Sequence, residues 1–130
     1  MTTREPISTD RAPAAAGPYS QAIRAGELVF TAGQLGIDPA TGALVGDDVA
    51  AQAERALTNL SAILEAAGSG MDRLVKVTVF LAEIGDWPAV NEVYARLVPE
   101  PFPARSAFAV KALPLGARVE VEGVAALGVG

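Results

Sequence analysis

The chain has 130 residues and a mass of 13.3 kDa, a length that predicts a single domain, residues 1–130, around one hydrophobic core. Hydrophobic residues make up 51% of it and charged residues 19%, which is typical of a globular fold rather than a disordered chain. Cysteine and histidine are absent, which excludes disulfides, thiolate nucleophiles, imidazole bases and most zinc, copper or haem sites. Any catalysis must therefore use carboxylate, guanidinium, hydroxyl, amide or backbone groups.

The charge balance and the N-terminal sequence set further limits. The formal net charge is −5, so a nucleic acid would be repelled unless one face were locally basic, and we expect no nucleic-acid partner. No apolar run is long enough to span a membrane, and Met1–Pro18 lacks the apolar stretch of a signal peptide. These features predict a cytoplasmic protein with no membrane partner.

The first half of the chain predicts an extended arm, a hairpin and a helix. Met1–Gly17 carries charges and prolines and is expected to lie as an arm against the domain. Two β-rich runs within Gln21–Thr31 flank Ala25-Gly26-Glu27, which favours a hairpin. Three- and four-residue spacing then predicts a helix, with Asp47 or Asp48 as its N-cap and Gly68 at its end; its apolar stripe is Val49, Ala53, Ala56, Leu57, Leu60, Ile63, Leu64 and Ala67.

The second half predicts three strands and another helix. Leu74–Leu81 is rich in β-branched residues at alternate positions and is expected to be a strand. A helix is predicted from Asp86, with Pro88 in its first turn and Pro99 and Pro101 beyond its end; Val90, Val93, Tyr94 and Leu97 form its apolar side. Strands at about Arg105–Ala112 and Arg118–Ala126 follow, joined through Leu113-Pro114-Leu115-Gly116.

The resulting order, β-β-α-β-α-β-β, predicts an α+β sheet with two helices on one face. Both faces of Leu74–Leu81 are largely apolar, yet two helices cover only one face of a sheet. We therefore predict that self-association buries the other face. The alternative is a half-exposed face with scattered apolar residues.

Arg105 and two glutamates are the first candidates for chemistry. Arg105 follows the proline-stiffened Phe102-Pro103-Ala104 and could bind a carboxylate with its planar fork, or could be a surface arginine paired with an acid. Glu120 and Glu122 share one face of a strand. A closed final hairpin would set residue 105 opposite 122 and residue 107 opposite 120 and gather all three charges, whereas the alternative is a pair of solvated glutamates.

Other candidates are weaker by themselves. Gly17-Pro18-Tyr19 and Gly33-Gln34 could let a ligand approach the backbone, and Asn91 fits helix capping or solvent contact. No nucleotide-binding glycine motif and no zinc motif is present.

Several separate blocks, in this order along nearly the whole chain, together resemble one family. They are Gly17-Pro18-Tyr19-Ser20-Gln21-Ala22, Thr31-Ala32-Gly33-Gln34, Asn91 with Tyr94, Phe102-Pro103-Ala104-Arg105-Ser106 and Val119-Glu120-Val121-Glu122. With these blocks the sequence resembles the reactive intermediate deaminases, also called RidA or YjgF-like proteins.

This resemblance implies a chorismate-mutase-like fold in a homotrimer, with the sheets packed inward as a barrel and pockets between subunits. It also implies hydrolysis of 2-aminoacrylate and related enamines or imines, including 2-iminopropanoate and 2-iminobutanoate, to 2-oxo acids and ammonia without a cofactor or a metal.

Carried onto this sequence, the family pattern makes Arg105 the clamp on the substrate carboxylate and Glu120 the group that activates water. Tyr19 and Asn91 would line the pocket from the adjoining subunit. The wall would be completed by Ala32, Gly33 and the backbone at Ala107. Many relatives carry cysteine where this chain has Ala107, which removes thiol-based regulation.

Two other functions stay open. A non-catalytic sensor of small 2-oxo or amino acids would need Arg105 but not Glu120. An endoribonuclease is disfavoured by the net charge and by the missing histidines.

Overall fold

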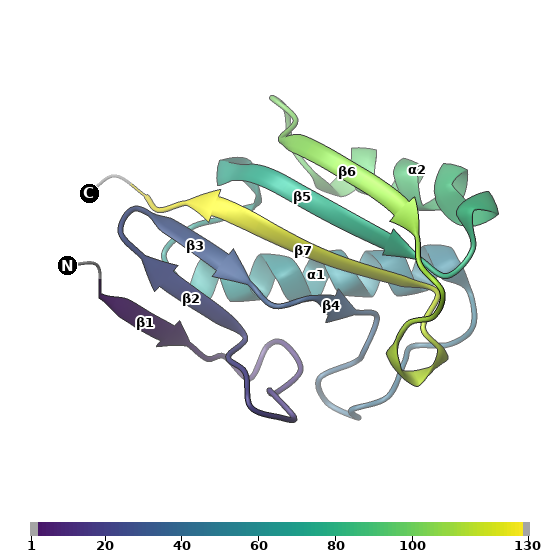
Figure 1. Ribbon diagram of the computed structural model, residues 1–130, viewed down its shortest axis with the longest axis horizontal. Coiled ribbons are helices and arrows are strands. Elements are labelled where there is room, and N and C mark those ends of the chain that lie inside the picture. The colour runs from purple at the N-terminus through teal and green to yellow at the C-terminus, as the bar shows by residue number, and fades with distance from the viewer. Residues whose placement is uncertain (1–2, 129–130) are drawn as a thin grey trace.

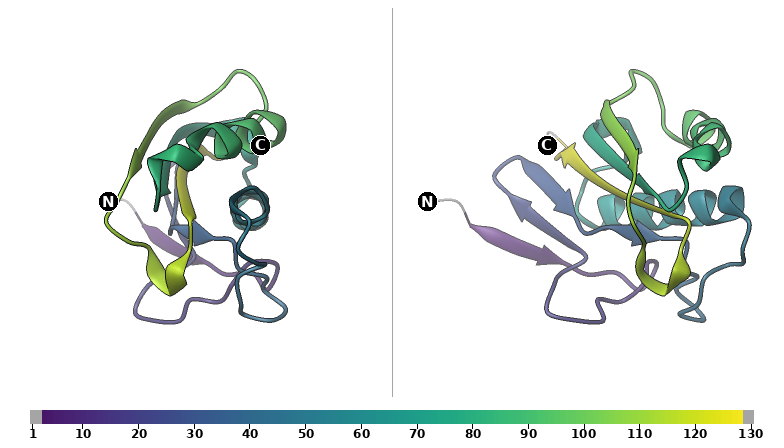
Figure 2. Two further views of the ribbon diagram at one scale, coloured as in Figure 1. Left: turned by 90° about the vertical axis from the view of Figure 1, so that its right-hand side faces the viewer. Right: turned by 45° about the vertical axis from the view of Figure 1, so that its right-hand side comes forward.

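The computed structural model describes residues 3–128, and in it one mixed sheet carries two α-helices on the same face (Figures 1 and 2). The helices are α1 (Val49–Ala66) and α2 (Trp87–Leu97). The strands are β1 (Arg4–Ile7), β2 (Ala22–Ala25), β3 (Leu28–Thr31), β4 (Gln34–Leu35), β5 (Leu74–Leu81), β6 (Ala104–Ala109) and β7 (Val119–Ala126). The predicted α+β class with both helices on one face is confirmed.

The strand order is β1-β2-β3-β7-β5-β6, with β4 paired to the remaining part of β7. All pairs are antiparallel except β5 with β6, which run parallel. The predicted element order lacked β1 and β4. Both are too short to show an alternating pattern, and each exists because a longer strand offers it a backbone ladder. Within residues 3–128, neither helix is long and apolar enough to cross a membrane.

The predicted N-terminal hairpin is confirmed, and the arm before it joins the same sheet. Strands β2 and β3 pair across a turn at Gly26, whose φ of 60° is a backbone conformation that glycine adopts without strain. The arm contributes β1, which pairs with β2 at the edge of the sheet. Met1 and Thr2, the start of the predicted arm, lie outside the described residues.

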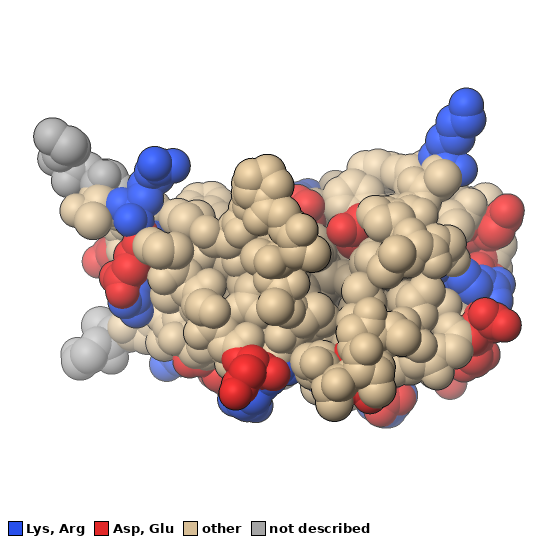
Figure 3. Space-filling view, turned by 90° about the horizontal axis from the view of Figure 1, so that it is seen from below, with Lys and Arg blue, Asp and Glu red and all other residues tan. Residues whose placement is uncertain are grey.

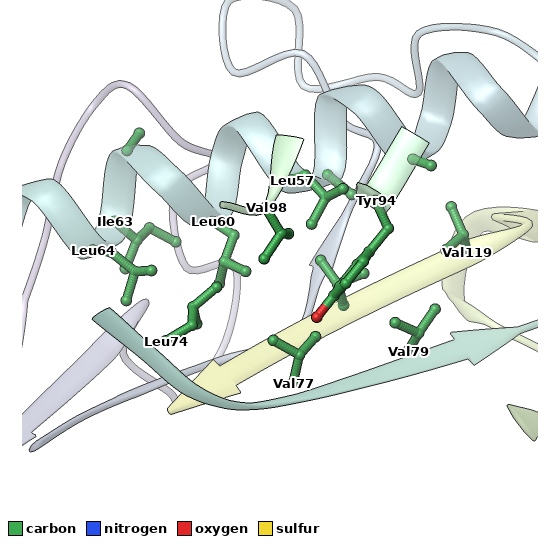
Figure 4. Packing of buried hydrophobic residues seen from close by; sticks show 14 of the residues in the cluster. Leu57, Leu60, Ile63, Leu64, Leu74, Val77, Val79, Tyr94, Val98 and Val119 are labelled. Atoms are coloured by element: carbon green, nitrogen blue, oxygen red, sulfur yellow. The ribbon is translucent and has the colours of Figure 1, made fainter. Parts of the chain in front are cut away.

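Helix α1 lies across the sheet and supplies more of the buried core residues than any other element. Its N-cap is Asp48, whose carboxylate accepts a hydrogen bond of 2.9 Å from the backbone N–H of Ala51. Its apolar stripe is buried as predicted, and Figure 4 shows it packed over the strands β5 and β7. The largest fully buried side chains are Leu57, Leu60, Ile63, Leu64, Leu81, Gln52, Val29, Val77, Val79, Val90, Val98 and Val119.

The second helix is fixed at its start by an ion pair to the sheet. The Arg118 guanidinium, just before β7, donates to both carboxylate oxygens of Asp86 at 2.9 and 2.8 Å. Asp86 immediately precedes α2, so this bidentate pair holds the first turn of the helix near the beginning of β7. The predicted helix and the strand Leu74–Leu81 are both confirmed.

The predicted final hairpin is wrong. Strands β6 and β7 do not pair with each other, because β5 lies between them and pairs with both. Arg105 stands opposite Val77 of β5, and Glu122 stands opposite Thr78 of β5. The physical reason is that Val77, Val79 and Leu81 of β5 are fully buried under the helices, which favours a central place for this strand with a partner on each side. The connection at 110–118, which includes a 3-10 turn at Pro114–Gly116, is long enough to pass around the end of β5 from β6 to β7.

The face of the sheet opposite the helices is not covered by any other part of the described chain (Figure 2). Phe30 and Phe108 point to this side and remain 44% and 45% exposed, although large aromatic side chains are normally buried. Phe80 packs edge-to-face on Phe108 at 5.4 Å between ring centroids. An uncovered face with exposed aromatic side chains is therefore present, but it is mixed rather than apolar, because Lys76, Glu120 and Glu122 also lie on it. Its burial by self-association stays a prediction.

Replacing Leu60 by alanine should strongly destabilise the fold. Leu60 is fully buried between α1 and the sheet, so the substitution removes apolar contacts and leaves a cavity. We expect a loss of about 2–5 kcal/mol in the free energy of unfolding, measured by urea denaturation at one fixed protein concentration. The control is Ile84→Ala, at a side chain 60% exposed, with an expected change within about 0.5 kcal/mol. Equal effects of the two substitutions would contradict this placement of the core.

Candidate active site

Arg105 lies at the start of β6, the edge strand next to α2. Its partner across the ladder is Val77, whose side chain is buried under the helices, so the Arg105 side chain points to the helix face of the sheet. There its guanidinium carbon lies 4.5 Å from the ring centroid of Trp87 and 4.7 Å from that of Tyr94. One Nη donates a hydrogen bond of 2.8 Å to Oδ1 of Asn91.

No carboxylate among residues 3–128 forms an ion pair with Arg105. The residue is exposed and borders a cavity of about 380 Å³ between α2 and β6. The cavity is lined by Asn91, Tyr94, Ala95, Phe102, Pro103 and Arg105. A guanidinium has five N–H donors, and a held arginine with most of them free is suited to binding a carboxylate from solution.

The sequence pattern gave no indication of Trp87. It placed Tyr94 on the apolar side of its helix and in a family block with Asn91, but gave it no role at the site. Trp87, Asn91 and Tyr94 are spaced four and three residues apart, so they lie on one side of α2, and this spacing was the available signal. Tyr94 is 2% exposed, and its hydroxyl has no hydrogen-bond partner in the described chain. Burial raises the pKa of Tyr94, and the nearby Arg105 charge opposes that rise.

Glu120 belongs to β7 and points to the opposite face. It stands opposite Phe80, in the alternate set of positions from the buried Val119 and Val121. Burial raises the pKa of the Glu120 carboxyl, and the neighbouring charge of Glu122 raises it further. No hydrogen bond or ion pair within residues 3–128 stabilises its ionised form.

Gly33 leaves the space that the Glu120 side chain occupies. A Cβ at position 33 would lie 2.8 Å from the carboxyl carbon of Glu120, a separation that real side chains do not show. Any other residue at position 33 would therefore displace this carboxylate. Glycine thus allows a close approach, as the sequence suggested for a ligand, and the group that approaches is the end of the flexible Glu120 side chain, so a larger residue would move this carboxylate rather than disrupt the fold.

Glu120 borders a second and larger cleft, of about 740 Å³. The cleft includes three of the predicted pocket residues, Tyr19, Ala32 and Gly33, and its full lining is Pro13, Ala14, Ala16, Tyr19, Gln21, Ala32, Gly33, Gln34, Leu35, Ile37, Pro39, Gly42, Pro114, Leu115 and Glu120. The loops that contribute to it lie along the lower edge of Figure 1, and Figure 3 shows that side as a largely uncharged surface with a hollow near its middle.

The predicted residues thus form two groups rather than one. Arg105 and Asn91 lie on the helix face, and Tyr19 lies with Glu120 in the second cleft, so the expected pairing of Tyr19 with Asn91 is wrong within one chain. Within one chain Arg105 and Glu120 also point to opposite sides of the sheet, because the hairpin that would have aligned them does not exist. Glu122 shares the face of Glu120 as predicted.

Ala107 belongs to neither group through its side chain, which packs against the hydrophobic core. It lies on β6 two residues beyond Arg105, opposite Val79. Its predicted role was a backbone role, and it stays a prediction.

Comparison with known proteins places similarity along almost the entire chain. A family model described as endoribonuclease L-PSP matches residues 9–127. The RutC family protein y4sK of Sinorhizobium fredii is 52% identical over 123 residues, covering 95% of this chain and 98% of that protein. The 2-iminobutanoate/2-iminopropanoate deaminase of Bos taurus is 51% identical over 125 residues, covering 96% of this chain and 91% of the relative.

Solved structures show the same fold. The crystal structure of E. coli TdcF with bound serine superposes with a TM-score of 0.91 at 38% sequence identity, covering 95% of this chain and 99% of TdcF. The similarity therefore includes both strands that carry Arg105 and Glu120 and the helix that contacts Arg105.

The raised pKa of Glu120 should be visible in a titration of its carboxyl group by NMR. We expect a midpoint above the ordinary glutamate value of about 4.5, because burial disfavours the charged form. Glu122→Gln removes the adjacent charge and should move the Glu120 midpoint to lower pH. Glu27→Gln, on a turn away from the cleft, is the control and should leave it unchanged. A Glu120 midpoint that did not respond to Glu122→Gln would refute the stated coupling.

Proposed function

The chain belongs to the reactive intermediate deaminase family, the family matched by the endoribonuclease L-PSP model, and we propose that this enzyme hydrolyses 2-imino acids such as 2-iminopropanoate and 2-iminobutanoate. The observation that carries the proposal is the Arg105 guanidinium, which is held by two rings and an amide and has no acidic partner in the described chain. The curated relative from Bos taurus is named for this activity, and TdcF binds serine, a small molecule with a carboxylate.

The active site in this proposal forms between two copies of the chain. One copy supplies Arg105 with Asn91, and the next supplies Glu120 with Tyr19, Ala32 and Gly33. A single chain places the two groups on opposite faces, so a site with both requires a neighbour. A closed ring of three copies gives every chain one of each half-site, and the uncovered face with its exposed Phe30 and Phe108 offers a surface for the assembly.

In this site Arg105 binds the substrate carboxylate and holds the imine carbon near Glu120. The ionised carboxylate of Glu120 takes a proton from a water molecule as the water oxygen attacks the carbon of the C=N bond. The proton passes from Glu120 to the nitrogen and gives a carbinolamine. The carbinolamine hydroxyl then loses its proton, through Glu120, to the same nitrogen as the C–N bond breaks and the C=O bond forms, so the products are a 2-oxo acid and ammonia. A raised pKa suits this role, because a general base works best when its pKa lies near the operating pH. An imine carbon is already electrophilic, so positioning and one base are enough.

A site shared between subunits can be tested by complementation. Arg105→Ala and Glu120→Ala chains, each made alone, should lose about 10-fold or more in kcat/KM, measured as pyruvate formation beside a serine dehydratase that generates the imine. Co-expression with two different tags and sequential purification yields trimers that contain both variants. Every such trimer has one intact site of three, so about one third of the wild-type activity should return.

Mixed trimers without activity, formed from chains that are each folded, would place Arg105 and Glu120 of a site in the same subunit or outside the site. Mixing wild-type chains that carry the same two tags is the control and should leave activity unchanged.

A Glu120 variant distinguishes the sensor alternative from the enzyme, because a sensor needs Arg105 but not Glu120. Calorimetric titration with 2-oxobutyrate should show binding to the wild type and none to Arg105→Ala, while Glu120→Ala should bind 2-oxobutyrate but lose turnover. Binding that depends on Arg105 in a protein without any turnover would instead favour a sensor.

The description of the matched family model raises a ribonuclease activity as a second candidate. The net charge of −5 and the absence of histidine argue against it, because RNA binding depends on positive charge and stacking surfaces. RNA cleavage that persists through repurification and is lost in Arg105→Ala would favour it.

A further inference from the structure

The guanidinium of Arg105 is enclosed in a way that its anion-binding role alone does not require. Trp87 and Tyr94 each present a ring within 5 Å of the guanidinium carbon, at 4.5 and 4.7 Å. Both rings come from α2, and Asn91 between them accepts one N–H at 2.8 Å. Three side chains of one helix thus contact a single exposed arginine of the neighbouring strand.

Aromatic rings hold an arginine differently from a carboxylate. A ring attracts the cation through its face, while the N–H donors of the guanidinium lie in the guanidinium plane and stay free at its edge. An acidic partner would instead occupy those donors and compete with an incoming anion. Asn91 takes one donor and carries no charge, so it orients the group without neutralising it.

The two rings are themselves held firmly. Tyr94 is 2% exposed and extends from α2 toward Val77 of β5 in the core (Figure 4). Trp87 is the first residue of α2 and directly follows Asp86, which the bidentate ion pair with Arg118 fixes to the sheet. We call Trp87 and Tyr94 together the clamp on Arg105. Tyr94 anchors this clamp to the core, and the ion pair beside Trp87 anchors it to the sheet.

We propose that Trp87 and Tyr94 are positioning residues that hold the Arg105 guanidinium against the faces of their rings, with its free N–H groups available to the substrate carboxylate in the cavity. This inference rests on the proposed function of Arg105 and adds residues to it. Without the rings, the exposed Arg105 side chain would sample many rotamers and lose that freedom each time an anion binds. The clamp thus increases affinity for substrate and leaves the chemical step unchanged.

The test is a KM-against-kcat comparison in the full chain, together with calorimetric binding of 2-oxobutyrate. Trp87→Ala should weaken 2-oxobutyrate binding and raise KM by about five- to tenfold, with kcat within about twofold of the wild type. Trp87→Phe keeps a ring face and should restore KM to within about twofold of the wild type. Ile84→Ala, an exposed side chain just before α2, is the matched control and should change neither constant.

The second ring is tested at Tyr94. Tyr94→Phe keeps the ring and removes only a buried hydroxyl that has no hydrogen-bond partner among residues 3–128, so binding of 2-oxobutyrate should equal the wild type and thermal stability should not fall. Tyr94→Leu should weaken binding by about the same factor as Trp87→Ala. If Tyr94→Leu does not fold, the comparison of Trp87→Ala with Trp87→Phe alone decides whether the clamp acts on binding.

Trp87 also provides a direct spectroscopic signature, because it is the only tryptophan of the chain. Adding butyrate, which carries a carboxylate and is transparent at the excitation wavelength, should change the tryptophan emission of the wild type and leave that of Arg105→Ala unchanged. A role limited to packing would produce no such response.

The outcomes separate this inference from the proposed function. If Arg105→Ala loses 2-oxobutyrate binding while Trp87→Ala binds it as tightly as the wild type, the clamp is overturned and the role of Arg105 stands. If Arg105→Ala binds 2-oxobutyrate normally, the role of Arg105 falls and the clamp falls with it. A loss in Trp87→Ala that Trp87→Phe fails to rescue would also overturn the clamp.

Discussion

The alternation of side chains across a pleated strand determines where each reactive group of this protein lies. Strand β5 is the reference, because β6 and β7 both pair with it and its odd-numbered residues from Val77 onward face the helices. Arg105 is in register with Val77 and so faces the helices, whereas Glu120 is in register with Phe80 and faces away. One pairing pattern therefore divides a cation from a carboxylate, and the proposed assembly is a consequence of that division.

The same division explains why each group has unusual surroundings. Were Arg105 and Glu120 neighbours in one chain, they would form an ion pair, the pKa of Glu120 would fall and Arg105 would be neutralised. Separated, Arg105 remains an anion-binding cation supported by uncharged rings and an amide. Glu120 remains a half-buried carboxyl whose pKa is raised by burial and by Glu122.

The sequence predicted what depends on local periodicity. The stripe from Val49 to Ala67 and the alternation in Leu74–Leu81 each determine one element by short-range pattern, and α1 and β5 match them. The pairing of β6 could not be predicted, because the residues 110–118 fit either a hairpin or a passage around the end of β5. The family blocks suggested the residues of the candidate site, and their roles stay predictions. Their grouping depends on that pairing, so Asn91 was expected beside Tyr19 but lies beside Arg105. Trp87 was missed because an aromatic residue at a helix start usually signals packing.

The proposed site, which requires two copies, would also link ligand binding to assembly. A substrate that binds only where the Arg105 group of one chain meets the Glu120 group of the next stabilises the oligomer by mass action and has no comparable affinity for a lone chain. The clamp on Arg105 strengthens this link, because α2 orients the guanidinium before a neighbour arrives and reduces the ordering cost that association would otherwise carry. If the proposed clamp acts on substrate binding, the ion pair between Arg118 and Asp86 contributes to it without touching substrate, since it fixes the first turn of the helix that carries Trp87.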